Sequence, residues 1–97
     1  MDRLSKKSLL RTSLIIGESA LEKLAKSRVI VCGVGGVGGA AAEALARSGV
    51  GLITIIDGDV VDITNLNRQI VATLENIGRD KAFEMAKRLK SVAEDVD

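Results

Sequence analysis

The sequence predicts an α/β fold built on a Rossmann-like βαβ unit, with two N-terminal helices before it and an incomplete parallel sheet. Two short, apolar, β-branched segments at residues 29–32 and 52–56 predict the strands, and an alanine-rich helical pattern lies between them. A glycine-rich turn joins the first strand to that helix. We therefore expect N-terminal helices in residues 1–27 and the N-terminal part of a Rossmann-like domain in residues 28–97.

Two helices are expected before the first strand. Apolar residues recur there at helical spacing: Leu9, Leu10, Leu14 and Ile15. This period predicts a helix over about residues 4–16, which Gly17 is expected to break, and a second short helix over residues 18–25. Two parallel strands cannot cover their own apolar faces, so we expect the four apolar residues to contact a second copy of the chain. The alternative is that these residues fold back on the sheet of their own chain.

The glycine-rich turn has the sequence Gly33-Val34-Gly35-Gly36-Val37-Gly38. Gly33 can form the tight turn, Gly35 lets the main chain approach a phosphate, and Gly38 lets the helix pack closely on the strand. The helix, expected over residues 39–48, would present unpaired N–H groups and the positive end of its dipole to an anion.

Asp57 follows the second strand directly, about 20 positions after the glycines. A carboxylate at this place can accept hydrogen bonds from ribose hydroxyls. The alternative is a tight glycine turn that binds nothing. This alternative does not explain why an acidic residue stands at the end of the second strand. Residues 28–57 are therefore interpreted as a nucleotide-binding βαβ unit.

The rest of the chain predicts one further helix. Residues 58–69 have no sustained period and are expected to form a structured loop with a helical turn or two. Gly78 ends a weak segment, and residues 79–93 keep a helical period. Such a helix should lead to a third strand, because a parallel sheet of only two strands is marginally stable. We expect the N-terminal portion of a larger protein, or a chain completed by association.

Composition excludes several classes of function. The 97 residues are 46% hydrophobic and 28% charged, which is typical of a globular protein, and the net charge of +1 excludes a global field that attracts nucleic acid or membranes. The absence of histidine excludes Ser-His and Cys-His catalytic pairs. Cys32, the only cysteine, is expected to be a buried thiol, with a nucleophile as the alternative. Because the chain has a free cysteine, no membrane-length apolar run and no signal peptide, we expect a cytoplasmic protein.

Four motifs together resemble one enzyme superfamily: Gly33–Gly38, Asp57-Gly58-Asp59, Asn65-Leu66-Asn67-Arg68-Gln69 and Gly78-Arg79-Asp80-Lys81. The chain resembles the adenylating enzymes of the ThiF, MoeB and HesA type, which include ubiquitin-activating enzymes and bacterial activators of sulfur-carrier proteins. Residues 11–17, 42–51 and 64–70 are most similar to the bacterial tRNA threonylcarbamoyladenosine dehydratases. The resemblance covers about residues 10–89.

The resemblance implies that residues 28–97 bind ATP rather than NAD, and it assigns roles to individual positions. Backbone N–H groups of the glycines would contact the nucleotide and Asp57 the ribose, while Asn65, Arg68 and Lys81 would contact the triphosphate. The implied nucleotide-binding residues are Gly33, Gly35, Gly36, Gly38, Asp57, Asp59 and Asn65, and the implied catalytic residues are Arg11, Arg68 and Lys81. Arg11 would reach the site of the partner subunit in a homodimer. No metal ligand is assigned within the chain, because the aspartate that binds Mg²⁺ with ATP is expected after residue 97.

Each assigned side chain also has an ordinary structural interpretation. Arg68 could pair with Asp59 or Asp62 on the surface, and Lys81 could be exposed in the first turn of its helix. A cation in the first turn of a helix interacts unfavourably with the helix dipole, so this position favours a functional role for Lys81. Likewise, Asn65 and Asn67 could form turns, and Arg11 could lie on a solvated helix face.

The function implied is ATP-dependent activation of a carboxylate as an acyl-adenylate. In the most similar branch the carboxylate belongs to threonylcarbamoyladenosine in tRNA, and the adenylate is lost as the side chain cyclises. Three alternatives stay open: activation of the C-terminal glycine of a sulfur-carrier or ubiquitin-like protein, NAD-dependent oxidation and reduction, and a non-catalytic nucleotide-binding or dimerisation module. The substrate-binding half is missing from these 97 residues, so the chain alone is expected to be inactive.

Overall fold

The computed structural model describes residues 7–93. In chain order its elements are α2 (Leu10–Ala25), β1 (Arg28–Cys32), α3 (Gly36–Arg47), β2 (Leu52–Ile56), the 3₁₀ helix η1 (Ile63–Asn65) and α4 (Lys81–Val92). The α/β class and the βαβ order are confirmed. Residues 4–6 of the first expected helix lie outside the described residues. No helix among those described is long and apolar enough to cross a membrane.

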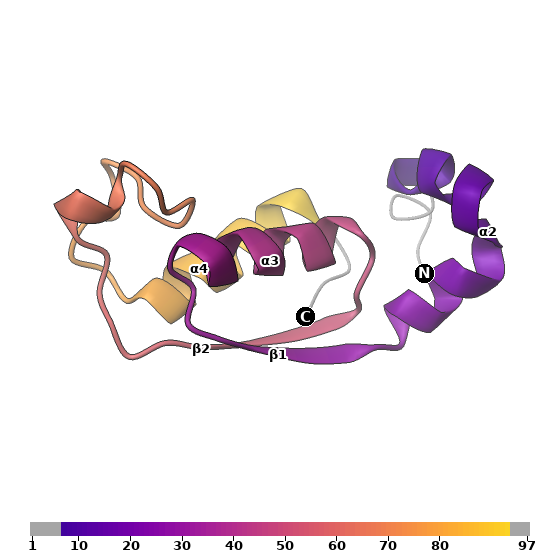
Figure 1. Cartoon of the computed structure of the whole chain (residues 1–97), viewed down its shortest axis with the longest axis horizontal. Coiled ribbons are helices and arrows are strands. Elements are labelled where there is room, and N and C mark those ends of the chain that lie inside the picture. The colour runs from indigo at the N-terminus through magenta and orange to yellow at the C-terminus, as the bar shows by residue number, and fades with distance from the viewer. Residues whose placement is uncertain (1–6, 94–97) are drawn as a thin grey trace.

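The sheet has two parallel strands within the described residues, with Val29 opposite Ile53 and Val31 opposite Ile55. Helices α3 and α4 lie side by side over one face of this sheet (Figure 1). These four aliphatic residues are buried or half-buried, because they face the helices. The sheet is incomplete, as the sequence predicts.

The opposite face of the sheet is not covered by the described residues, and it carries the exposed side chains of Ile30 and Ile56. Cys32 belongs to this face and is exposed. The expectation of a buried thiol was wrong, because no described residue covers this face of the sheet. The bare face leaves the last residue of β1 open to solvent.

The core is aliphatic, as the scarcity of aromatic residues requires, and it joins the sheet to both helices. Its buried members are Val34, Ala42, Ala46, Val50, Ile53, Val71, Met85 and Leu89.

Small alanines on α3 let α4 approach, and an ion pair links the two helices, with Arg88 Nε 2.6 Å from Glu43 Oε1. The Arg88 guanidinium is the main reason that the pKa of Glu43 lies below its ordinary value of 4.5. Phe83, the only aromatic residue, is 65% exposed.

Helix α2 contains a kink at Gly17, where φ is 84° and ψ is 162°. The predicted break between two helices is therefore confirmed, although the two halves run on without a connecting loop. The second half is anchored by buried Leu21. In the first half Leu14 and Ile15 are exposed, the latter by 86%.

Leu9, just before α2, does not belong to the exposed stripe. It is buried, and a Cβ added to Gly49 would lie 3.0 Å from its Cδ1. The expectation that Leu9 contacts a second copy was therefore wrong, because its side chain packs within the chain. Leu10, Leu14 and Ile15 keep their exposed positions.

The segment between β2 and α4 is the structured loop that the sequence predicts. It contains one helical turn, η1, and it returns to α4 through an antiparallel bridge between Val60 and Asp80. Asp80 is the N-cap of α4 and its side chain accepts a hydrogen bond from the N–H of Phe83 at 3.0 Å. For this reason α4 begins at Lys81, two residues later than expected.

Candidate functional site

The turn between β1 and α3 brings main-chain N–H groups to the carboxyl end of the sheet. Gly33 has a φ of 85°, which glycine adopts without strain, and its N–H donates to the Ile56 carbonyl at 2.7 Å. A Cβ added to Gly38 would collide with the carbonyl oxygen of Gly33. Gly35 is the N-cap and offers no side-chain hydrogen bond to α3. The first N–H groups of α3 are therefore available to an anion.

Asp57 connects this turn to the loop after β2. Its Oδ2 accepts a hydrogen bond from the N–H of Val34 at 2.9 Å, and its Oδ1 accepts one from the N–H of Asp59 at 2.8 Å. The bond from Val34 is the largest cause that lowers the pKa of Asp57 below 3.8, the Asp59 bond and the charge of Lys81 add to it, and burial opposes them. Asp57 is therefore ionised at neutral pH, and each oxygen retains a lone pair for a further donor.

Lys81 is buried, with only 6% of its surface exposed, so the interpretation as an exposed first-turn residue was wrong. Its N–H donates to the Asp59 carbonyl at 3.0 Å, which fixes the start of α4 against the loop after β2. Its positive charge lowers the pKa of Asp57, and also that of Asp62, where hydrogen bonds from Thr64 are the larger cause. Within residues 7–93 Lys81 forms no ion pair. A buried cation without a bound counter-ion is suited to an anionic ligand.

Asn65 is the last residue of η1, and Arg68 lies on the loop that follows it. The Asn65 side chain is buried and its Oδ1 accepts a hydrogen bond from the N–H of Asp62 at 2.8 Å, so it does form a turn, as its ordinary interpretation predicts. Arg68 is exposed, and its Nη1 donates to the carbonyl of Thr64 at 3.1 Å and to Asn67 Oδ1 at 3.0 Å. It makes no ion pair with Asp59 or Asp62, both of which lie in the described part of the chain. The guanidinium therefore keeps donors for a ligand.

Gln69 is a buried residue beside the glycine turn that reasoning from sequence did not select. A Cβ added to Gly35 would lie 3.4 Å from Gln69 Nε2, so the amide covers the N-cap of α3. Its Oε1 is buried and has no hydrogen-bond partner among the described residues. The available signal was its place directly after Arg68 in the same polar motif.

Arg11 is not part of this assembly within one chain. It is exposed on α2, which lies at the opposite end of the molecule from the turn between β1 and α3 (Figure 1). The structure thus brings together the glycine turn, Asp57 and Lys81, with Asp59 between them. Residues 7–93 contain no cluster of three or more side chains suited to a metal ion.

Comparison with known proteins identifies the family. The model of the ThiF family matches residues 7–97. This chain belongs to the ThiF family. The resemblance stated from the motifs is therefore confirmed at the level of the family.

Several ThiF-type relatives are similar to this chain. The tRNA threonylcarbamoyladenosine dehydratase of Bacillus subtilis is 54% identical over 82 residues, which cover 84% of this chain and 32% of that protein. The sulfur carrier protein ThiS adenylyltransferase of the same organism is 40% identical and covers 84% of this chain and 25% of the relative. The chain spans about a third or less of the length of these relatives.

Solved structures agree with the fold. The crystal structure of Escherichia coli tRNA N6-threonylcarbamoyladenosine dehydratase, TcdA, in complex with ATP has a TM-score of 0.94 and 43% sequence identity. The match covers 98% of this chain and 39% of the TcdA chain. The Rossmann-like architecture expected from the sequence is thereby confirmed.

Proposed function

We propose that residues 28–97 are the N-terminal part of an ATP-binding domain, in an enzyme that activates a carboxylate as an acyl-adenylate. The observation that carries the proposal is the meeting of three features at the carboxyl end of the sheet. An uncapped helix start offers N–H donors, Asp57 is held ionised by Val34, and buried Lys81 has no counter-ion among the described residues. A family member crystallised with ATP matches nearly the whole chain and supports the same ligand.

The donor set fits a nucleoside triphosphate. The N–H groups of Gly35, Gly36 and Gly38 would contact phosphate oxygens, whereas the expected contact from the Gly33 N–H is excluded because that group donates to the Ile56 carbonyl. The free lone pairs of Asp57 would accept hydrogen bonds from the ribose hydroxyls. Asp59 is exposed on the loop after β2, and its main chain joins Asp57 to Lys81 through two hydrogen bonds. Asn65 would contribute its amide nitrogen to the triphosphate, because its amide oxygen already accepts from Asp62.

Arg68 and Lys81 would act in the chemical step. Attack of a carboxylate on the α-phosphate expels pyrophosphate, so negative charge builds on the bridging and terminal oxygens. Fixed cations stabilise that charge better than water does, because they need no reorganisation during the reaction. Lys81 is held by burial, whereas Arg68 would turn from its loop contacts towards the phosphates.

We propose that Mg²⁺ accompanies ATP and that its aspartate ligand lies after residue 97, as the resemblance to the family implies. Residues 7–93 contain no group of three or more side chains suited to a metal ion. Bound Mg²⁺ would neutralise part of the triphosphate charge.

We propose threonylcarbamoyladenosine in tRNA as the source of the carboxylate, with cyclisation of the side chain expelling AMP. The 54%-identical relative from Bacillus subtilis is a tRNA threonylcarbamoyladenosine dehydratase, which supports this substrate. The C-terminal glycine of a sulfur-carrier protein is the second candidate, supported by the ThiS adenylyltransferase relative. We also propose a cytoplasmic location, which either substrate and the free thiol of Cys32 support.

We further propose a homodimer. The first half of α2 exposes Leu10, Leu14 and Ile15, and Arg11 lies among them on the same helical segment. Because α2 lies far from the glycine turn of its own chain, Arg11 would serve the site of a partner subunit (Figure 1). Burial of the exposed apolar residues would stabilise the association.

Exchange of radiolabelled pyrophosphate into ATP by the full-length protein tests the proposal. We expect exchange that depends on tRNA carrying threonylcarbamoyladenosine, and a cyclised nucleoside in the digested tRNA. Exchange driven only by a carrier protein with a C-terminal glycine would favour the second candidate. Preferential binding of NAD over ATP would contradict adenylation, and ATP binding without any exchange would leave a non-catalytic module.

A further inference from the structure

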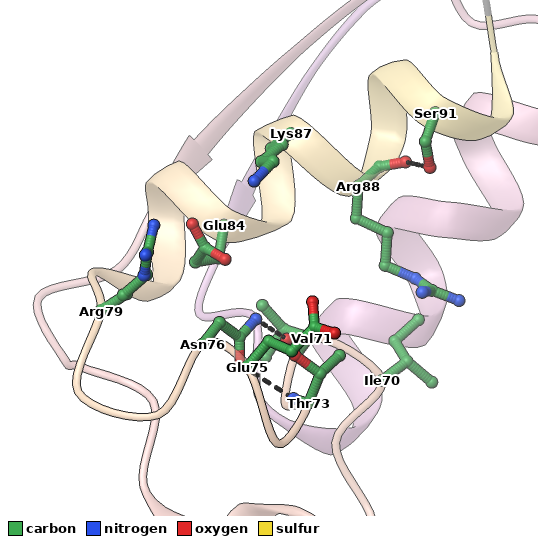
Figure 2. Close-up of a pocket in the computed structure, with 10 residues that line it drawn as sticks. All are labelled: Ile70, Val71, Thr73, Glu75, Asn76, Arg79, Glu84, Lys87, Arg88 and Ser91. Atoms are coloured by element: carbon green, nitrogen blue, oxygen red, sulfur yellow. Dashed lines mark hydrogen bonds between the residues drawn. The ribbon is translucent and has the colours of Figure 1, made fainter.

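A cavity lies between α4 and residues 70–79, with a volume of about 280 Å³ (Figure 2). None of the residues that line it belongs to the proposed nucleotide site. The loop that forms its wall is held by Asn76, whose Nδ2 donates to the Val71 carbonyl at 2.7 Å and whose Oδ1 accepts from the N–H of Thr73 at 2.8 Å. Because Asn76 is itself buried, the cavity has a fixed wall.

Glu84, on α4, is the unusual group in this cavity. Only 7% of its surface is exposed, and its Oε2 is buried without a hydrogen-bond partner in the part of the chain that the structure describes. Arg88, one turn further on, cannot serve as its counter-ion because it is bound to Glu43 at 2.6 Å. A buried carboxylate without a partner is costly, and a cationic donor that entered the cavity would remove this cost.

Charges of both signs surround Glu84. Figure 2 shows its carboxylate between Arg79 and Asn76, with Glu75 reaching into the cavity from the loop and Lys87 on the next turn of α4. Neither Arg79 nor Lys87 forms an ion pair with any described residue. Two carboxylates and two unpaired cations therefore face the same space, which favours a ligand that carries both charges.

We propose that this cavity binds a small zwitterion of the α-amino-acid class. Its ammonium group would pair with Glu84, and its carboxylate would lie against Arg79 and Lys87. The volume is consistent with this class, since 280 Å³ equals roughly nine times the share of one water molecule in the liquid.

The twenty free α-amino acids, added singly to the isotope-labelled full-length protein, are the probes, and NMR amide shifts are the readout. We expect at least one amino acid to shift amides of residues 70–79 and of α4 around Glu84. The Glu84→Gln variant should bind it about tenfold more weakly, because a charge-assisted hydrogen bond is lost. Glu18→Gln, at an exposed carboxylate on α2, is the matched control and should bind it unchanged.

A second comparison tests whether the carboxylate of the ligand is recognised. It changes Lys87, an exposed residue whose replacement leaves the core intact. Lys87→Ala should weaken binding of the amino acid but leave that of n-butylamine, which has no carboxylate, unchanged. The proposal is overturned if no amino acid shifts these amides, if n-butylamine binds as tightly as every amino acid, or if Glu84→Gln binds like the wild type. ATP binding is measured in parallel, and its presence or absence bears only on the nucleotide site.

Discussion

The carboxylate of Asp57 should stabilise the fold as well as bind a nucleotide, and Asp57→Asn isolates its structural part. An asparagine has one oxygen acceptor, whereas Asp57 accepts from both Val34 and Asp59. In the variant one of these N–H groups faces the amide NH₂ and loses its partner. The turn before α3 and the loop after β2 would then be joined by a single neutral hydrogen bond.

The expected loss of stability is about 2–4 kcal/mol. A hydrogen bond to a charged group contributes about 1.5–3 kcal/mol, and the half-buried bond from Val34 should lie within this range. The bond from Asp59 is exposed and adds less. Such a loss is a large share of the roughly 5–15 kcal/mol that stabilises a typical domain.

Urea unfolding followed by circular dichroism measures the loss at pH 7, and amide hydrogen exchange at Val34 reports the bond directly. Asp59→Asn, an exposed carboxylate whose side chain accepts no hydrogen bond in the described region, should stay within about 0.5 kcal/mol of the wild type. A similarly small effect of Asp57→Asn, with unchanged protection of Val34, would refute the reasoning.

The pH dependence of the stability tests whether the ionised form of Asp57 is the stabilising one. Because folding lowers the pKa of Asp57 from its ordinary 3.8, its stabilisation is fully present above that value and is lost as the pH falls through the lowered pKa. The difference between wild type and Asp57→Asn should therefore be constant near neutral pH and should shrink in acid below about 3.8. A difference that grows in acid would contradict this assignment.

Three further predictions concern the turn, the chemical step and the association. Gly38→Ala should cost about 1–3 kcal/mol in urea unfolding because its Cβ meets a main-chain carbonyl, while Gly36→Ala, which meets open space, should be tolerated. In the full-length protein Lys81→Ala and Arg68→Ala should each lower carboxylate-dependent pyrophosphate exchange by about 10²-fold, and near-normal exchange would reduce them to structural charges. If the proposed dimer forms, Leu14→Asp should convert it to a monomer in light scattering at tens of micromolar, and a wild-type monomer there would exclude the dimer.

Local sequence signals predicted the parts of the fold that depend on local chemistry. The apolar runs located β1 and β2, and the glycine spacing located the turn, because only glycine meets its steric demands. The start of α3 was placed three residues late, at residue 39 rather than Gly36, because glycines have low helix propensity and interrupt the apolar period. The start of α4 was placed two residues early because the capping role of Asp80 was not recognised.

Burial depended on long-range packing and was predicted less well. Cys32 is exposed and Lys81 is buried, which is the reverse of what residue type alone suggests. Both outcomes follow from the path of the chain, since one face of the sheet is bare and the loop after β2 returns to the start of α4. Gln69 and Glu84 are buried polar residues for the same reason, and no local pattern marks them.

The contacts that join the glycine turn to the end of β2 also decide how the two strands align. A slip of one residue would turn Val29 and Val31 away from the helices, and a sheet of only two strands has few ladder bonds to resist it. The slip would also separate Val34 from Asp57 and Gly33 from the Ile56 carbonyl. Deletions that shorten β1 should therefore scramble strand pairing, whereas insertions in the loop between α3 and β2 should leave the alignment intact.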